Sequence, residues 1–206
     1  LQFLSGAIDR IKKIRGIEID IDTIPLDDKN VFKMLSRGET VGVFQMAGSG
    51  MTAYVKDLRP TRVEDLMAMV ALYRPGPMEV IPEYIKRKQN PAMIKYPDPR
   101  LKDDLEASYG LLVYQDDVLI TAIRLAGYSW LDADKLRKAM GKKIIEKLNH
   151  LKPLFLEGGQ ANGHDKKVLE KIWADWEKFA SYAFNKSHST CYAWIAYQTA
   201  YLKANY

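Results

Sequence analysis

The sequence predicts a mainly α fold, a multi-helix body of irregular arrangement with little strand content. Apolar residues recur every three or four positions along most of the 206 residues, which is the period of an amphipathic helix. Glycines follow many of these segments, at positions where helices commonly end. The composition, 47% hydrophobic and 28% charged, is typical of a chain that buries a core.

The first part of the chain predicts short helices separated by turns. A helix period over residues 4–14 ends at Gly16, and an extended piece over 17–21 leads to a second helix over 31–35, capped by Asp27-Asp28 and ended by Gly38. Residues 40–44 are β-branched and aromatic and form the best strand candidate. The turn Gly48-Ser49-Gly50 then precedes a helix through Leu58.

A capping box and a proline turn mark the next helix. Thr61 and Glu64 have the spacing at which a hydroxyl and a carboxylate cap a helix reciprocally, and an apolar run over 66–72 follows. Arg74-Pro75-Gly76-Pro77 ends it, because proline cannot donate a backbone hydrogen bond. Residues 82–99 are rich in proline and charge, which predicts a loop with one short helix around Tyr84.

The rest of the chain predicts a series of helices. Glycines at 110, 127, 141, 158–159 and 163 stand at plausible C-terminal positions. We expect a loose subdivision of the chain near residues 91–99. The predicted helices cover residues 101–108, 118–126, 132–140, 144–157, 166–184 and 192–206.

Composition limits the classes of function. The 31 Lys and Arg against 26 Asp and Glu give a net charge of +5, which weakly favours polyanionic partners such as nucleic acid. The single cysteine, Cys191, excludes an internal disulfide and fits a cytoplasmic setting, and its apolar neighbours predict that it fills the core. No apolar run is long enough to cross a membrane. Because the chain lacks an initiator Met and stops inside a helical pattern, we expect it to be a fragment.

Two sets of charged residues are candidates for chemistry. Glu18, Asp20 and Asp22 alternate with isoleucines and could share one strand face as metal ligands, although a solvated edge is the preferred interpretation. In the predicted helix 132–140, Asp134 and Lys138 are spaced to pair. Two alternatives explain the next cluster, which is either a phosphate-binding site or a solvated basic helix end. Its residues are Arg137, Lys138, Lys142 and Lys143.

A second candidate site lies near residue 186. Tyr182 and His188 offer rings on which a base could stack, and Lys186 offers a cation to phosphate. Taken alone, Tyr182 and Phe184 are more often core or boundary residues and His188 a structural histidine. Arg74 either touches nucleic-acid phosphate or forms a salt bridge at a rigid corner. His150 and His164 are expected at the surface.

The order of several motifs resembles the fingers region of the bacterial DNA polymerase III alpha family. The segments that carry the resemblance are Ile24-Pro25-Leu26-Asp27-Asp28, Thr40-Val41-Gly42-Val43-Phe44-Gln45, Ala71-Leu72-Tyr73-Arg74-Pro75-Gly76-Pro77, Tyr109-Gly110 through Tyr114-Gln115, Ala126-Gly127-Tyr128, residues 133–143, Phe184-Asn185-Lys186-Ser187-His188-Ser189 and residues 197–203. The resemblance implies an irregular multi-helix fingers domain over residues 24–206, preceded by the end of a palm domain or a connecting helix over 1–23.

The resemblance also implies a function. Members are DNA-directed DNA polymerases that add deoxynucleoside triphosphates to a primer-template DNA with Mg²⁺ held by palm aspartates, which would lie outside this chain. No catalytic or metal-binding residue is therefore expected here, and the fragment alone would be inactive. The sliding clamp, the proofreading exonuclease subunit and the clamp loader would contact other regions of the parent. The implied nucleotide-binding residues are Arg137, Lys138, Tyr182, Lys186, Ser187 and His188, with Arg74, Lys142 and Lys143 as possible DNA or phosphate contacts.

Two other hypotheses belong to different classes. A basic helical module that binds nucleic acid without a catalytic role would lose affinity steeply with salt and would not depend on nucleotide. A helical scaffold could meet protein partners through exposed tryptophans. Positions in the core explain the tryptophans more simply. The four tryptophans are Trp130, Trp173, Trp176 and Trp194.

Overall fold

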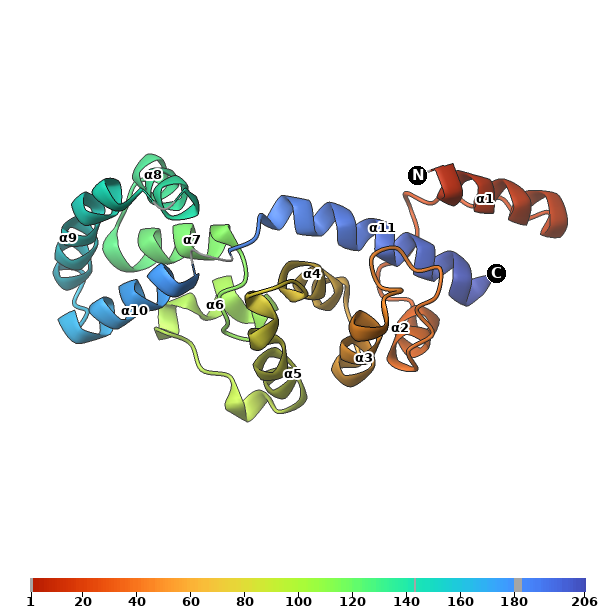
Figure 1. Ribbon diagram of the computed structural model, residues 1–206, viewed down its shortest axis with the longest axis horizontal. Coiled ribbons are helices and arrows are strands. Elements are labelled where there is room, and N and C mark those ends of the chain that lie inside the picture. The colour runs from red at the N-terminus through yellow and green to blue at the C-terminus, as the bar shows by residue number, and fades with distance from the viewer. Residues whose placement is uncertain (1, 143, 180–182) are drawn as a thin grey trace. The chain divides into compact units, whose positions relative to one another are not determined.

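The computed structural model describes residues 2–142, 144–179 and 183–206, and it confirms a mainly α fold (Figure 1). The described part of the chain forms α-helices and short 3-10 helices, and its one isolated β-bridge joins Tyr114 to Phe184. Contacts divide the chain into two compact units, residues 1–73 with 187–206 and residues 74–186. Residues 91–99 lie inside the second unit, and the assignment of 1–23 and 24–206 to palm and fingers stays a prediction.

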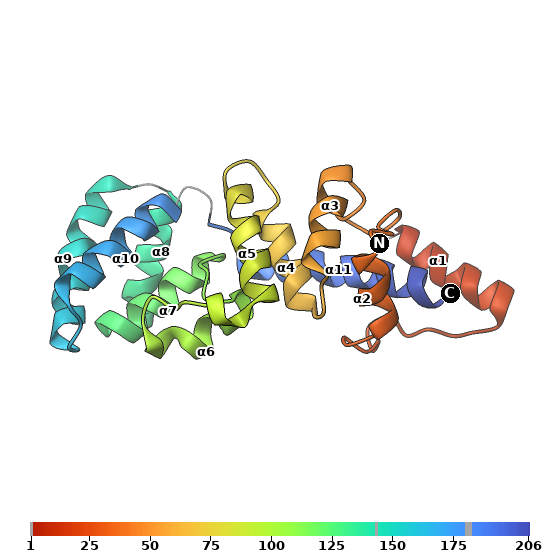
Figure 2. The same cartoon turned by 90° about the horizontal axis from the view of Figure 1, so that it is seen from below.

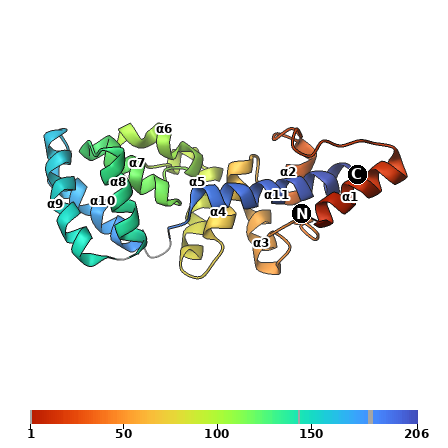
Figure 3. The same cartoon turned by 90° about the horizontal axis from the view of Figure 1, so that it is seen from above.

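The first unit is built around its C-terminal helix. Tyr197 on α11 accepts a hydrogen bond from the Asp28 backbone and donates one to the Pro25 carbonyl, while Ser189 donates to the Met67 carbonyl. Figures 1 and 3 show α11 alongside α4. The helices of this unit are α1 (Gln2–Arg15), α2 (Lys29–Ser36), α3 (Ser49–Leu58), α4 (Val63–Leu72) and α11 (Lys186–Asn205), whose first residue belongs to the second unit.

Two local predictions in the first unit are wrong. Residues 40–44 form successive turns instead of a strand, because Gly42 and Gln45 both have positive φ, and Thr40 and Val43 are the buried residues of this segment. At the start of α4 the carboxylate of buried Asp65, not Glu64, accepts a hydrogen bond from the Thr61 backbone at 2.9 Å. The predicted helix limits at Gly16 and Gly38, both with positive φ, are confirmed.

The second unit packs its helices around an aromatic centre. Phe155 lies 4.6 Å from Trp176 and 5.7 Å from Trp173, measured between ring centroids. Helix α7 packs against α8 and α9, and Figures 1 and 2 show α10 alongside α9. The helices are α5 (Ile81–Gln89), α6 (Lys102–Leu105), α7 (Gln115–Ala126), α8 (Trp130–Gly141), α9 (Ile145–Ala161) and α10 (Lys166–Phe179), with 3-10 helices Pro77–Val80, Pro91–Met93, Pro99–Leu101 and Glu106–Ser108.

Two predictions in this unit need correction. Gly158 and Gly159 do not end a helix but lie inside α9, because a Cβ on Gly158 would overlap the Ala126 carbonyl and one on Gly159 would meet Leu169. Residues 81–89 form a full helix where mostly loop is predicted, since Tyr84 is completely buried and anchors it. Gly158 and Gly159 therefore serve close helix packing rather than helix termination.

Side chains outside the candidate site also depart from expectation. Cys191 is exposed rather than in the core, because the buried face of α11 passes through Ser189, Ala193 and Ala196 instead. His164 is buried, with Nδ1 3.2 Å from a carboxylate oxygen of Asp98, because the turn at the end of α9 folds it inward.

The four tryptophans do not share one environment. Trp173 and Trp176 are core residues, as expected. Trp130 is 67% exposed, because it occupies the first turn of α8 outside the packed face, and Trp194 is half-buried. The expectation that all four are core is therefore wrong for Trp130.

Candidate functional site

The start of α7 is fixed by a buried carboxylate. Asp117 is 6% exposed, and its Oδ2 accepts hydrogen bonds from the backbone nitrogens of Val113 at 2.7 Å and Tyr114 at 2.8 Å. Burial raises the pKa of Asp117 to about 6, although these two hydrogen bonds and the charge of Lys186 act in the opposite direction. The backbone that leads into the helix is therefore held by one internal side chain.

A second segment, distant in sequence, pairs with this helix start. The Gln115 nitrogen donates to the Phe184 carbonyl at 2.9 Å, and Tyr114 and Phe184 form a parallel β-bridge. We call this element the 114–184 bridge, comprising residues 114, 115 and 184. It brings the first residue of α11, Lys186, to the N-terminal end of α7.

Three cations among the described residues contact the 114–184 bridge, and all three belong to the second unit. The guanidinium carbon of Arg74 lies 4.7 Å from the centroid of the Phe184 ring, and Lys186 Nζ lies 5.5 Å from the centroid of Tyr114. Arg137 Nη1 donates to Gln115 Oε1 at 3.1 Å. Side chains from residues 74, 137 and 186 thus meet one small element, which is what an anion site requires.

The environment of these cations favours strong electrostatics. Arg74 is half-buried, and this partial removal from water lowers the pKa of its guanidinium. An anion bound beside a partly dehydrated cation interacts more strongly than it would in bulk water. Arg74 makes a cation–π contact here, so its role as a DNA or phosphate contact remains a prediction.

Asp134 holds the two adjacent cations of α8. Arg137 donates to Asp134 Oδ1 through Nε at 3.0 Å and Nη2 at 2.7 Å, and Lys138 Nζ lies 2.6 Å from Oδ2. The hydrogen bonds from Lys138 and then Arg137 lower the pKa of Asp134. The predicted pairing of Asp134 with Lys138 is confirmed. The side chain of Arg137 is 26% exposed and that of Lys138 is 63% exposed, so the arginine is the more fixed of the two.

The remaining predicted site residues lie elsewhere or outside the described residues. Ser187 and His188 belong to the first unit, where both are exposed and the His188 ring lies 4.2 Å from that of Tyr192. Lys142 is exposed at the end of α8. Tyr182 and Lys143 lie outside the described residues.

Sequence reasoning assigned no role to the residues that organise this site. Tyr114 and Gln115 belong to a motif that carried the resemblance, but their contacts join positions about 70 residues apart and leave no local pattern. Asp117 had a usable signal, because an acidic residue three positions after a helix start can accept the N-cap backbone hydrogen bond.

The described residues offer neither a metal cluster nor a membrane span. No group of three or more His, Cys, Asp or Glu side chains among them could hold a metal ion, Glu18, Asp20 and Asp22 included. Within the same residues, no helix has the length and apolar character needed to cross a membrane.

Sequence comparisons relate the chain to known proteins. The sequence profile of the bacterial DNA polymerase III alpha subunit finger domain matches residues 1–163. The chain is similar to DNA polymerase III subunit alpha of Thermus aquaticus, with 44% identity over 211 residues, and to that of Aquifex aeolicus, with 43% over 198. The corresponding subunit of Chlamydia trachomatis is 46% identical over 209 residues.

Coverage is nearly complete for this chain and small for the relatives. The alignments cover 100%, 95% and 100% of the chain, respectively, but 17% of the length of each relative. The profile match covers well over half of the 206 residues. The chain therefore belongs to the bacterial DNA polymerase III alpha subunit finger domain family.

Proposed function

We propose that this chain binds the triphosphate of an incoming deoxynucleotide and the adjacent primer-template DNA as part of a DNA-directed DNA polymerase. The observation that carries the proposal is the convergence of Arg74, Arg137 and Lys186 on the 114–184 bridge. Phosphoryl transfer depends mostly on positioning and on charges placed where the phosphate oxygens become more negative. Three cations from separate segments supply such charges.

The individual residues have different roles in this proposal. Arg137 is the main triphosphate ligand, because Asp134 and Gln115 already hold its guanidinium in one position. Lys186 adds a second positive charge at the 114–184 bridge. Lys138 contributes charge without a fork, and Tyr182, Ser187 and His188 are proposed to lie beside the base or the phosphates.

The larger context belongs to the parent protein. A whole polymerase of this family would extend a primer in the bacterial cytoplasm, with Mg²⁺ held by residues outside this chain, and the isolated fragment would be inactive. Residues 24–206 would form the fingers and 1–23 the connection from the palm. The sliding clamp, proofreading exonuclease subunit and clamp loader would bind elsewhere on the parent.

The test is primer extension by a full alpha subunit that contains this segment. We expect Arg137→Ala and Lys186→Ala each to lower kcat/KM for the deoxynucleotide by about 10–100-fold, the loss typical of one charged hydrogen bond. Lys167→Ala is the matched control, because Lys167 is exposed on α10 and distant in sequence from both segments. Its kcat/KM should stay at the wild-type value.

The same experiment separates polymerase from simple nucleic-acid binding. Loss of deoxynucleotide affinity in both variants would support the proposal. If both variants extended primers with wild-type kcat/KM and only DNA affinity fell with added salt, a basic nucleic-acid-binding module would explain the cations better.

A further inference from the structure

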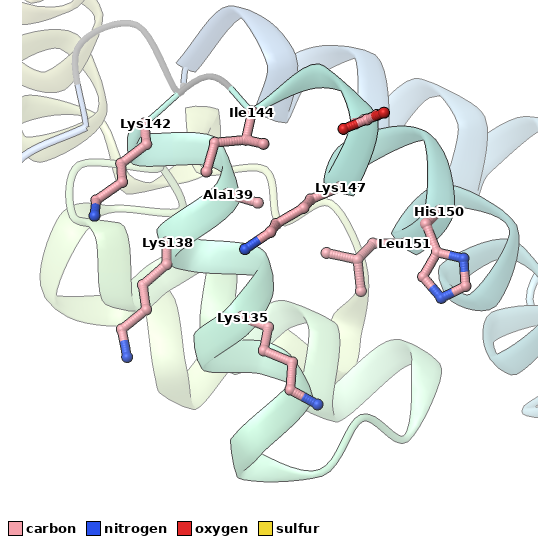
Figure 4. A pocket seen from close by; sticks show the side chains of 9 residues that line it. Lys135, Lys138, Ala139, Lys142, Ile144, Lys147, His150 and Leu151 are labelled. Atoms are coloured by element: carbon pink, nitrogen blue, oxygen red, sulfur yellow. The ribbon is translucent and has the colours of Figure 1, made fainter.

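A groove with a basic rim lies between α8 and α9, lined by residues distinct from those at the 114–184 bridge. Its volume is about 530 Å³. Ala139, Ile144 and Leu151 form an apolar floor, as Figure 4 shows. The charged and polar residues that line it are Lys135, Lys138, Lys142, Glu146, Lys147 and His150. The lining carries four lysines against one glutamate and is therefore net positive.

The lysines of the groove lie on a different face of α8 from Arg137. Lys135, Lys138 and Lys142 follow at positions i, i+3 and i+7, so they share one side of the helix and span about 10 Å along its axis. Arg137 lies on the neighbouring side, where it contacts Gln115 of α7. An anion in the groove therefore need not compete for the Arg137 guanidinium.

The lysines of the rim differ in how they are paired. Lys135 and Lys138 form ion pairs with Asp132 and Asp134 at 2.8 and 2.6 Å. Among the described residues, no carboxylate lies within ion-pair distance of Lys142 or Lys147. In Figure 4, Lys147 extends from α9 toward α8 across the floor of the groove. The groove thus carries positive charge that its own carboxylates do not neutralise.

We propose that this groove binds the sugar-phosphate backbone of single-stranded DNA. The proposal rests on the proposed function for the choice of DNA as ligand, and apart from Lys138 it uses side chains other than those proposed to bind the triphosphate. A single strand can place sugars and base faces on the apolar floor and phosphates at the lysines, whereas a duplex presents mainly its charged phosphates. The His150 ring, next to the floor, offers a surface for one base.

The test measures binding of a short fluorescent oligothymidylate to this chain by anisotropy at several salt concentrations. Lys147→Glu should weaken binding about tenfold and reduce the slope of log affinity against log salt by about 0.7 for each phosphate that the variant no longer neutralises. Lys167→Glu is the matched control, because it makes the same charge change on exposed α10. It should change affinity less than about twofold.

Three outcomes would contradict the proposed single-stranded DNA site. Lys147→Glu and Lys167→Glu could weaken binding equally, which would show that only net charge matters. Duplex DNA could bind as tightly as the single strand. Polyglutamate could displace the oligonucleotide at equal charge concentration, which would favour an acidic protein partner.

Deoxynucleotide binding distinguishes this proposal from the previous one. Lys147→Glu should leave the affinity for a deoxynucleoside triphosphate unchanged, whereas Arg137→Ala should lower it and leave oligothymidylate binding within about twofold. If Arg137→Ala left triphosphate affinity unchanged, the nucleotide site would be contradicted. If Lys147→Glu left oligothymidylate affinity unchanged, only the proposed single-stranded DNA site would be contradicted. Thermal unfolding of each variant provides the check on folding.

Discussion

Helix α8 has cations on two faces, and the two faces are held in different ways. On one face, Arg137 is three-quarters buried and hydrogen-bonded to Asp134 and Gln115. On the other, the lysines of the α8–α9 groove are exposed and Lys142 stands at the helix end. The first face is anchored to the 114–184 bridge, and the second projects into solvent.

The difference indicates two kinds of recognition. A cation with fixed hydrogen bonds can meet a ligand of defined geometry, because little side-chain entropy is lost on binding. Flexible lysines on an apolar groove suit a chain of phosphates whose position varies, and their contribution falls with salt. Asp117 anchors the element that holds the rigid face. Its replacement should therefore reduce the difference between the two faces of α8 most strongly.

Replacement of Asp117 by alanine should have the largest effect. It would leave the Val113 and Tyr114 nitrogens without their acceptor, and each buried unpaired donor costs about 1–3 kcal/mol. We expect urea unfolding to show a loss of about 2–6 kcal/mol. Asp116→Ala, one residue earlier and half-buried, should cost below about 1 kcal/mol. Equal losses in the two variants would contradict the anchoring role.

The pH dependence of stability should reveal the same carboxyl group. Folding raises the pKa of Asp117 from 3.8 to about 6, so between these values the folded chain binds more protons than the unfolded one. The contribution of Asp117 to the free energy of unfolding is therefore present at low pH and falls by up to about 3 kcal/mol as pH rises through about 6.

Asp117→Asn isolates this contribution, because the asparagine oxygen can still accept both backbone hydrogen bonds but has no charge. We expect unfolding free energies measured from about pH 4 to about pH 7 to give a wild-type minus variant difference that decreases with pH. A difference that is constant or increases with pH would show that Asp117 is not protonated more readily in the folded chain.

Replacement of Gln115 should have a smaller effect, confined to the face of α8 that carries Arg137. Gln115→Ala removes the acceptor that orients Arg137 Nη1 but leaves the Asp134 contacts. We expect the affinity of the chain for a deoxynucleoside triphosphate, measured by calorimetry, to fall about three- to tenfold. Gln115→Glu, which keeps an acceptor, should recover arginine orientation but repel the phosphates. Unchanged affinity in Gln115→Ala would remove Gln115 from the site.

The smallest effect is expected on the exposed face. Lys135→Ala breaks only the ion pair with Asp132, in which both side chains are about half exposed. The free energy of unfolding, measured by thermal unfolding, should change by less than about 0.5 kcal/mol. A larger loss would mean that the groove lysines are structural, and the contrast between the two faces of α8 would fail.

The helical fold was predictable because its signals are local. The helix period and the glycines at 16, 38 and 127 located most helices, and each of these glycines adopts positive φ where a helix ends. The errors arose where tertiary contacts override local preference. Residues 40–44 favour a strand by composition, but positive φ at Gly42 and Gln45 turns the chain, and Gly158 is required by the nearby Ala126 carbonyl.

The site was predictable only in part. The basic pattern around Arg137 and the motif at Lys186 identified two cations that the structure brings to the same bridge. The bridge itself could not be predicted, since the hydrogen bond from Gln115 to Phe184 depends on how distant segments pack. Burial of Asp117 and exposure of Cys191 depend on the same packing.

The measurement that tests the central claim most directly is a double-mutant cycle between Arg137 and Lys186 on deoxynucleoside triphosphate affinity. If both cations contact one triphosphate, Arg137→Ala and Lys186→Ala should each weaken binding, and their effects should couple by about 0.5–3 kcal/mol. The same cycle with deoxynucleoside in place of triphosphate should show no coupling. Strictly additive effects for the triphosphate, or an effect of only one substitution, would contradict a shared phosphate site.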